Sequence, residues 1–299
     1  IEEMLSHKNI DLAIICSPSG MHYSHASILI NNGINVLVEK PLTLTVHKSQ
    51  MLGNLAKEKK VLLNVAFQNR LNPAIQILKK TFLEGRFGKI VTSTVRVRWC
   101  RYQEYYDDEW HGKWFADGGV INQQAIHHVD ALNWLLGPVD SLTATITNRL
   151  NNLEAEDTLV SIMKFEDGAL GTIEATTAAR PEDFEASLSV VGEKGMVLVG
   201  GIALNKIEIW KFVDPINEDV DIPNLYSQEV ETGYGISHGP LLQNIIDSLQ
   251  NGNINAPISA MDGIQTSYMV HALYRSDELQ SWVKLKDRPI SKRLGNKLR

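Results

Sequence analysis

Lys40 and His127 are the two residues whose types and surroundings best suit proton transfer. Lys40 lies two residues after the strand-like run 35–38, between Glu39 and a proline. A lysine beside another positive charge has a lowered pKa and can serve as an acid or a base. A histidine exchanges a proton near neutral pH. Because single lysines and histidines are more often solvated or structural, the elements around them must decide the role.

The segment that carries His127 predicts a helix over Val120–Leu136 with two different faces. The apolar face predicts core contact and comprises Ala125, Val129, Leu132 and Leu136. The opposite face, about 200° around the helix, comprises Gln123, His127, Asp130 and Trp134. Asp117 is expected to cap this helix, and Gly118-Gly119 predicts backbone packed closely against a neighbour. His128, about 100° from His127, is expected to be structural.

The pair His127-His128 raises a metal site as an alternative. Adjacent residues on a helix point in different directions, and no cluster of cysteines or glutamates accompanies this pair. The sequence therefore predicts no metal ligands, and it favours proton transfer by Lys40 and His127.

The first part of the chain predicts a parallel sheet that would position Lys40. Apolar runs at 11–16, 35–38 and 61–67 alternate with helical patterns at 21–32 and 44–59. The run 11–16 is continuous, which predicts a strand buried on both faces. Ligands of such sheets bind beyond the carboxyl ends of the strands. Those ends carry Ser17 and Pro18, then Glu39 and Lys40, and then Gln68.

The pattern changes after Lys89, where residues begin to alternate between apolar and polar. Strands with one solvated face are expected at 90–99, 141–148, 158–165, 169–175, 187–191, 196–199 and 207–212. Further helices are expected at 73–84, 241–250 and 263–280. We expect an α/β domain over 1–88, followed by an α+β domain over 89–299 with a large, open-faced, mostly antiparallel sheet.

Composition excludes several classes of protein. The chain has 299 residues, a net charge of −6 and two cysteines. The acidic balance argues against binding nucleic acid by bulk electrostatics, and two cysteines cannot form a disulfide framework. No apolar run approaches the roughly 20 residues of a membrane span. We expect a cytoplasmic homo-oligomer, a dimer or tetramer, in which the open sheet face is covered.

The order of several motifs along the chain resembles the Gfo/Idh/MocA family of oxidoreductases. These motifs are Cys16–His22, Glu39-Lys40-Pro41, Arg70–Pro73, Gly85–Ile90, Gly118–Asp130, Phe165–Gly168, Gly192–Gly195 and Asp262-Gly263. The resemblance implies a Rossmann domain followed by an open-faced sheet domain. It also implies hydride transfer between NAD and a carbon of a sugar or cyclitol, with NADP left open.

The resemblance assigns roles to individual residues. Lys40 would contact the substrate hydroxyl and the nicotinamide ribose, and His127 would take the hydroxyl proton. The cofactor would be held by Ser17, Pro18, His22, Glu39, Lys40 and Gln68. Many family members carry an aspartate where this chain has Gln123, and a glutamine can only hydrogen-bond rather than relay a proton.

The segment around Arg98 and Arg101 resembles family members that oxidise C3 of UDP-N-acetylated uronic acids in surface-polysaccharide biosynthesis. Such a nucleotide sugar carries diphosphate and carboxylate charges that these arginines could pair. The substrate residues implied are Arg98, Arg101, Gln123, Gln124, His127 and His238. An inositol or simple-sugar dehydrogenase and a non-catalytic cofactor or sugar sensor are the alternatives.

The start of the chain is also informative under this resemblance. Family members place about fifty residues, including a Gly-x-Gly-x-x-Gly turn, before the position of Ile1. The sequence therefore predicts a truncated Rossmann domain that would bind NAD poorly by itself.

Overall fold

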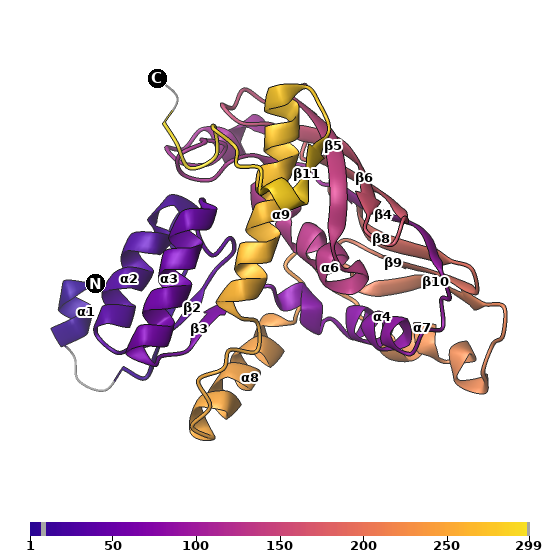
Figure 1. Cartoon of the computed structure of the whole chain (residues 1–299), viewed down its shortest axis with the longest axis horizontal. Helices are drawn as coiled ribbons and strands as arrows, with labels where there is room; N and C mark the ends of the chain where they lie inside the picture. Colours follow the sequence, from indigo (N-terminus) through magenta and orange to yellow (C-terminus); the bar gives the residue numbers. More distant parts are fainter. Residues whose placement is uncertain (7–9, 298–299) are drawn as a thin grey trace.

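The small sheet at the start of the chain is parallel, as the sequence predicts. The computed structural model describes residues 1–6 and 10–297 (Figure 1). Strands β1 (Leu12–Ile15), β2 (Asn35–Val38) and β3 (Leu63–Val65) pair in that order. Helices α2 (His22–Asn31) and α3 (Val46–Lys59) connect them and lie side by side, and a short helix α1 (Glu2–Ser6) precedes β1. The carboxyl ends of the three strands therefore meet at one edge.

The prediction that the first strand is buried on both faces is wrong. Among the described residues β1 pairs with β2 alone, so it forms an edge of the sheet. The side chains of Ala13 and Ile15 are buried, whereas Ile14 is 49% exposed. A continuous apolar run thus marks a strand but does not say how many of its faces are covered.

The large sheet contains eight strands and is antiparallel except at one pair. Its order is β10-β9-β8-β4-β7-β6-β5-β11. The strands are β4 (Ile90–Arg98), β5 (Val139–Thr147), β6 (Thr158–Phe165), β7 (Leu170–Thr176), β8 (Glu185–Gly192), β9 (Gly195–Gly200), β10 (Lys206–Phe212) and β11 (Val283–Lys284). The parallel pair is β4–β7 at the centre. This confirms the predicted open, mostly antiparallel sheet, apart from the two-residue β11, which shows no sequence pattern.

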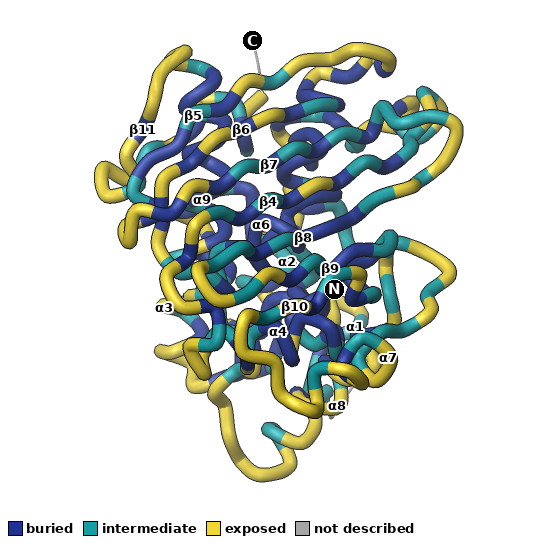
Figure 2. The backbone as a smooth tube through the Cα atoms, turned by 90° about the vertical axis from the view of Figure 1, so that its right-hand side faces the viewer, coloured by how far each residue is buried: buried dark blue, intermediate teal, exposed yellow. Residues whose placement is uncertain are grey.

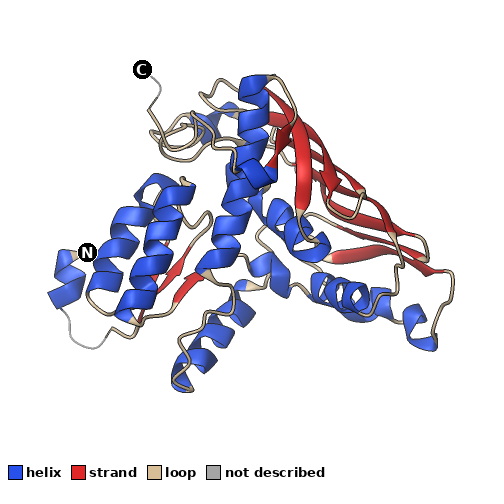
Figure 3. Cartoon of the chain, viewed as in Figure 1, coloured by secondary structure: helices blue, strands red, loops and turns tan. Residues whose placement is uncertain are grey.

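Most helices that follow β3 lie on one face of the large sheet (Figure 3). They are α4 (Pro73–Leu83), α5 (Val120–Gln123), α6 (Ile126–Leu136), α7 (Ile222–Tyr226) and α9 (Ala260–Leu279), whereas α8 (His238–Gln250) stands apart from the sheet and packs on the turn after β3. Helix α6 packs against β4 and β8, and α9 packs against β5. Along β6 and β7, successive residues alternate between buried and more exposed, so the face of the sheet opposite the helices is open (Figure 2). Within the described ranges, no helix is long and apolar enough to cross a membrane.

The predicted single helix over 120–136 is two helices, α5 and α6, with a joint at Gln124-Ala125. The backbone N–H groups of both joint residues donate to the Val120 carbonyl, at 3.0 and 2.8 Å. The predicted cap is also wrong. The Asp117 side chain accepts from the Gly112 N–H instead, and Gly119 occupies the N-cap position without a side-chain cap. The amphipathic pattern continues through the joint, so it did not reveal the break.

Helix α9 stands between the two sheets and joins them (Figure 1). It packs against α3 and β3 on one side and against β5 on the other. Just before it, the Ile258 carbonyl accepts from the Val65 N–H at 3.1 Å, and the Ile258 N–H donates to the Asn64 side chain at 3.0 Å. The end of the chain therefore completes the packing of its first sheet.

Candidate active site

The ammonium group of Lys40 is held by the residue at the end of α5. Its Nζ donates to the Gln123 carbonyl at 2.7 Å and to Gln123 Oε1 at 2.9 Å. In an unbroken helix the Gln123 carbonyl would accept from the N–H four residues later. The joint after α5 leaves this carbonyl for Lys40. The helix break thus supplies an acceptor for a lysine that lies just after strand β2 and precedes a cis Lys40–Pro41 bond.

A cavity of about 260 Å³ opens beside this contact. It collects residues from the ends of β2, β3 and β4, from the α5–α6 joint, and from two loops. The lining residues are Lys40, Gln68, Trp99, Arg101, Tyr105, Gln123, Gln124, His127, Asp183, Thr232, Gly233 and Tyr234. Six residues singled out from the sequence as site residues are therefore brought together here.

His127 lies in the wall of the cavity with its imidazole buried. Burial lowers its pKa well below 6.5, and the nearby positive charge of Lys40 acts in the same direction. The imidazole is therefore neutral at pH 7. Its ring meets Phe67 edge-on with 6.0 Å between centroids, and its Nδ1 is buried without a hydrogen-bond partner in the described structure. His128 is fully buried against Trp99, which fits the structural role expected for it.

Burial perturbs Lys40 and Asp117 in opposite directions. It lowers the pKa of Lys40, against the attraction of Glu39 and Asp117, and it raises the pKa of Asp117 to about 7. Each change favours the neutral form of a group removed from water. Lys40 is therefore easier to deprotonate than a surface lysine, and this is the property that acid–base chemistry needs.

The rim residue Arg101 lies between two aromatic rings. Its guanidinium carbon is 5.6 Å from the centroid of the Trp99 ring and 5.7 Å from that of Tyr105. Nη1 donates to Asp183 at 2.9 Å. Asp183 and Thr232 also line the cavity, but no signal in the sequence identifies them, because both lie in loops where no periodic pattern marks a residue as facing inward.

Arg98 is not brought into this cavity. It ends β4 and donates to Glu174 of β7 at 2.7 and 2.8 Å and to Glu185 of β8 at 3.1 Å. His238 also lies outside the lining. Its Nε2 faces Glu39 Oε1 at 3.6 Å, which links the start of α8 to the end of β2.

The remaining expected cofactor residues tie the strand ends together. The buried ring of His22 bridges the Pro41 carbonyl at 2.7 Å and the Ser17 carbonyl at 2.9 Å. Ser17 Oγ is 2.9 Å from His25 Nδ1, and Pro18 precedes a 3-10 turn. His22 therefore packs between the loops after β1 and β2, and both of its ring nitrogens face backbone carbonyls.

The segment Gly235–Gly239 contains a Gly-x-Ser-x-Gly pattern, which in hydrolases presents a nucleophilic serine after a strand. Here the preceding regular element in the described chain is helix α7, not a strand, and Ser237 leads into α8. Ser237 Oγ donates to Asn72 Oδ1 at 2.6 Å in a buried contact. The pattern is thus structural in this protein.

A buried ion pair sets the position of α6. Arg70 donates through Nε and Nη2 to both carboxylate oxygens of Asp130, each at 2.7 Å, and through Nη1 to Asp262 at 2.7 Å. Thr266 also donates to Asp130 at 2.7 Å. Asp130 lies on the polar face predicted for this helix, but its role is to join α6 to α9 and to the turn after β3.

Two family models match the sequence. One describes the C-terminal alpha/beta domain of the Gfo/Idh/MocA oxidoreductases and matches residues 79–285. The other describes the NAD-binding Rossmann fold of the same family and matches residues 1–67. The chain belongs to the Gfo/Idh/MocA oxidoreductase family. This confirms the resemblance drawn from the sequence motifs.

Solved structures of WlbA dehydrogenases, both in complex with NADH and UDP-GlcNAcA, are similar to this chain. The Bordetella pertussis protein is 36% identical, with 95% of this chain and 81% of that one covered at a TM-score of 0.86. The Chromobacterium violaceum protein is 34% identical, with 95% and 80% covered at a TM-score of 0.87.

Among curated proteins, the NADP-dependent scyllo-inositol 2-dehydrogenase of Bacillus subtilis is 31% identical. That match covers 52% of this chain and 43% of the relative. The chain spans about half the length of the curated relatives it matches.

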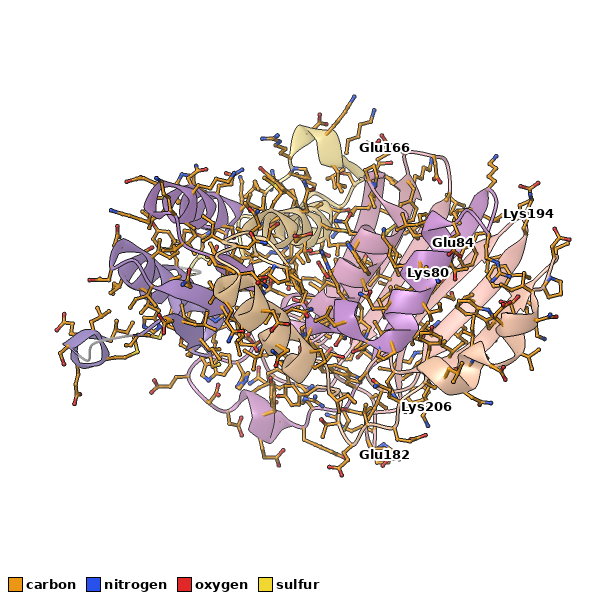
Figure 4. The ribbon with its side chains drawn as sticks, turned by 90° about the horizontal axis from the view of Figure 1, so that it is seen from below. Lys80, Glu84, Glu166, Glu182, Lys194 and Lys206 are labelled. Carbon is orange, nitrogen blue, oxygen red and sulfur yellow. The ribbon has the colours of Figure 1, made fainter. Side chains whose placement is uncertain are left out.

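The buried ion pair between Asp130 and Arg70 should contribute strongly to the free energy of unfolding. Replacing Asp130 by alanine leaves Arg70 partly unpaired in the interior and should cost about 3–5 kcal/mol of unfolding free energy. Chemical denaturation of the purified variant measures this cost. Glu84→Ala is the matched control, since Glu84 and Lys80 form an exposed pair 3.9 Å apart on α4 (Figure 4). Its expected cost is within about 0.5 kcal/mol. Equal effects of the two variants would contradict the assignment.

Proposed function

We propose that this protein is a dehydrogenase that transfers hydride from C3 of a UDP-N-acetylated uronic acid to NAD. The supporting observation is its 34–36% identity, over 95% of the chain, to two WlbA dehydrogenases whose structures contain NADH and UDP-GlcNAcA. The cavity that joins Lys40, His127 and Arg101 supports the same proposal, because it places a basic group, a neutral imidazole and a cation at one site.

The residues at the ends of the parallel strands fit a nicotinamide cofactor. Gln68 Oε1, His127 Nδ1 and Trp99 Nε1 are buried without partners in the described structure. Buried polar atoms are nearly always hydrogen-bonded in proteins, so a polar ligand is expected to complete them. Gln68 and Lys40 would hold the cofactor, which supplies a hydride acceptor when bound.

In this proposal the chain's own residues perform the proton chemistry. The substrate hydroxyl lies between Lys40 and His127. His127 accepts the hydroxyl proton, since its low pKa keeps it neutral, and the charge of Lys40 stabilises the oxygen as the proton leaves. Gln123 contributes the two oxygens that orient the Lys40 ammonium. It supplies no proton, because an amide does not titrate.

A dehydrogenase of inositol or a simple sugar is the second candidate. The 31% identity to scyllo-inositol 2-dehydrogenase favours it over half of the chain. Arg101 and the two rings beside it favour the nucleotide sugar. A guanidinium pairs with anionic groups, and the rings of Trp99 and Tyr105 can stack on the faces of a planar base or a sugar.

Removing either the Lys40 ammonium or the His127 imidazole should abolish most of the activity. With NAD and UDP-N-acetylglucosaminuronic acid, Lys40→Met and His127→Ala are each expected to lower kcat between about a hundredfold and ten-thousandfold. Absorbance at 340 nm measures the NADH formed. Lys80→Met and His47→Ala, on exposed helix surfaces, are the matched controls and should retain wild-type rates. Full activity of the two site variants would refute the proposed roles.

Arg101 should decide between the two substrate classes. Loss of a charged hydrogen bond in Arg101→Ala is expected to lower kcat/KM for the UDP-sugar by about tenfold to a hundredfold. Rates with scyllo-inositol or free sugars should stay at the wild-type level. Arg98→Ala serves as the control, since Arg98 is paired with Glu174 and Glu185 outside the cavity. A wild-type protein that oxidises inositol and ignores the UDP-sugar would favour the second candidate.

We also propose that two or four copies of the chain associate through the open face of the large sheet. That face exposes apolar side chains on three strands: Val160 and Ile162 on β6, Leu170 on β7 and Met196 on β9. An uncovered sheet face with exposed apolar side chains is a typical association surface.

Ile162→Glu should therefore shift the protein to a monomer, as measured by light scattering during size-exclusion chromatography. Leu83→Glu introduces the same charge at an exposed leucine of α4 and should leave the mass unchanged. A wild-type monomer would overturn the oligomer proposal.

A further inference from the structure

We propose that Glu156 is a positioning residue: it holds the start of α5 and, through Gln123, sets the place of the Lys40 ammonium. This inference rests on the proposed function, because Lys40 is its endpoint. Glu156 lies in the turn before β6, is fully buried, and does not line the cavity. The sequence analysis assigned it no role.

Three N–H groups at the start of α5, those of Gly119, Val120 and Ile121, donate to Glu156 or to its partner Tyr274. The Glu156 carbonyl accepts from the Val120 N–H at 3.0 Å, and Oε1 accepts from the Ile121 N–H at 3.1 Å. Tyr274 donates its hydroxyl to the same Oε1 at 2.9 Å and accepts from the Gly119 N–H at 3.2 Å. The first turn of a helix leaves these N–H groups without partners, so a buried α5 requires such acceptors.

The local sequence makes room for this arrangement and provides no substitute for it. A Cβ on Gly119 would collide with the Glu156 carboxyl, so glycine is required where the two meet. This confirms the close packing predicted from the two glycines. The side chain of Asp117 is turned to the Gly112 N–H and does not cap α5. Glu156 is thus the carboxyl group on which this helix start depends.

Helix α5 is so short that the position of its last residue depends on how its first residues are held. It contains four residues, Val120–Gln123, which form about one turn and are not stable in isolation. The last of them provides both oxygens that bind Lys40 Nζ. Loss of the hydrogen bonds that Glu156 and Tyr274 accept from Gly119–Ile121 would therefore move the two oxygens that bind the Lys40 ammonium. A misplacement of about 1 Å can cost on the order of a hundredfold in rate.

The carboxyl group serves here mainly in its neutral form. Burial raises the pKa of Glu156 to about 8, so the protonated acid predominates at pH 7. A glutamine reproduces the size of this form and retains an Oε1 that accepts hydrogen bonds. Glu156→Gln should therefore preserve the hydrogen bonds that Oε1 accepts from the Ile121 N–H and the Tyr274 hydroxyl, whereas Glu156→Ala removes them.

Two readouts on the purified protein test this inference. In Glu156→Ala, kcat with NAD and the UDP-sugar should fall on the order of tenfold to a hundredfold, with the KM for NAD unchanged. Reductive methylation by formaldehyde and cyanoborohydride, which reduces the imine formed, followed by peptide mass spectrometry, should label Lys40 several-fold faster than in the wild type. Glu156→Gln should restore both values. Tyr274→Phe removes only the hydroxyl bridge to Gly119 and should shift both readouts in the same direction if the alanine variant does not fold.

The neighbouring carboxylate provides a matched control. Asp157 is equally buried, but it accepts from the N–H groups of Arg149, Leu150 and Asn151 and makes no hydrogen bond to α5 in the described structure. Asp157→Ala should lower the melting temperature without changing Lys40 labelling. Equal labelling of Lys40 in the wild type and in folded Glu156→Ala or Tyr274→Phe would overturn the inference, as would faster labelling in Asp157→Ala. Because labelling needs no turnover, it gives an answer even if the UDP-sugar is not the substrate.

Discussion

The contact between the Lys40 ammonium and Gln123 is the interaction on which the site depends. A lysine drawn out of water must find oxygen acceptors, and a regular helix has no spare carbonyl in its middle. Here the helix is interrupted, and the residue before the break offers a carbonyl and an amide oxygen together. The same interruption places His127 one turn further along, at the wall of the same cavity. The irregular backbone thus serves both groups.

That contact joins two parts of the chain, so its geometry depends on how they are fastened. Three sets of contacts do this. Arg70 binds Asp130 and Asp262, which links the turn after β3 to α6 and α9. Helix α9 packs on both sheets, and His238 faces Glu39 at the rim. The first of these is buried and bidentate, the strongest kind of side-chain pairing, so we expect it to limit motion between Gln68 and His127 most.

Much of this organisation can be predicted from the sequence, and the exceptions have physical causes. Parallel strands place their following residues at one edge, so the neighbourhood of Ser17, Lys40 and Gln68 follows from the order of strands and helices. Periodicity brought out His127 in the same way. Periodicity could not reveal the break after Gln123, because the apolar and the polar face predicted for this helix both continue through it. Arg98 and Arg101 look alike in sequence. Only the pairing of β4 with β7 and β8 separates an arginine bound to Glu174 from one at the cavity.

The most direct test of the account follows the hydrogen that leaves the sugar. The purified protein is incubated with NAD and UDP-N-acetylglucosaminuronic acid that carries deuterium at C3, and the reduced cofactor is analysed by mass spectrometry. The account predicts that the deuterium appears in the reduced nicotinamide, with a rate below that of the unlabelled sugar if hydride transfer limits turnover. Reduced cofactor without deuterium would place oxidation at another carbon. No reduced cofactor, from a protein shown to bind NADH, would contradict the proposed reaction.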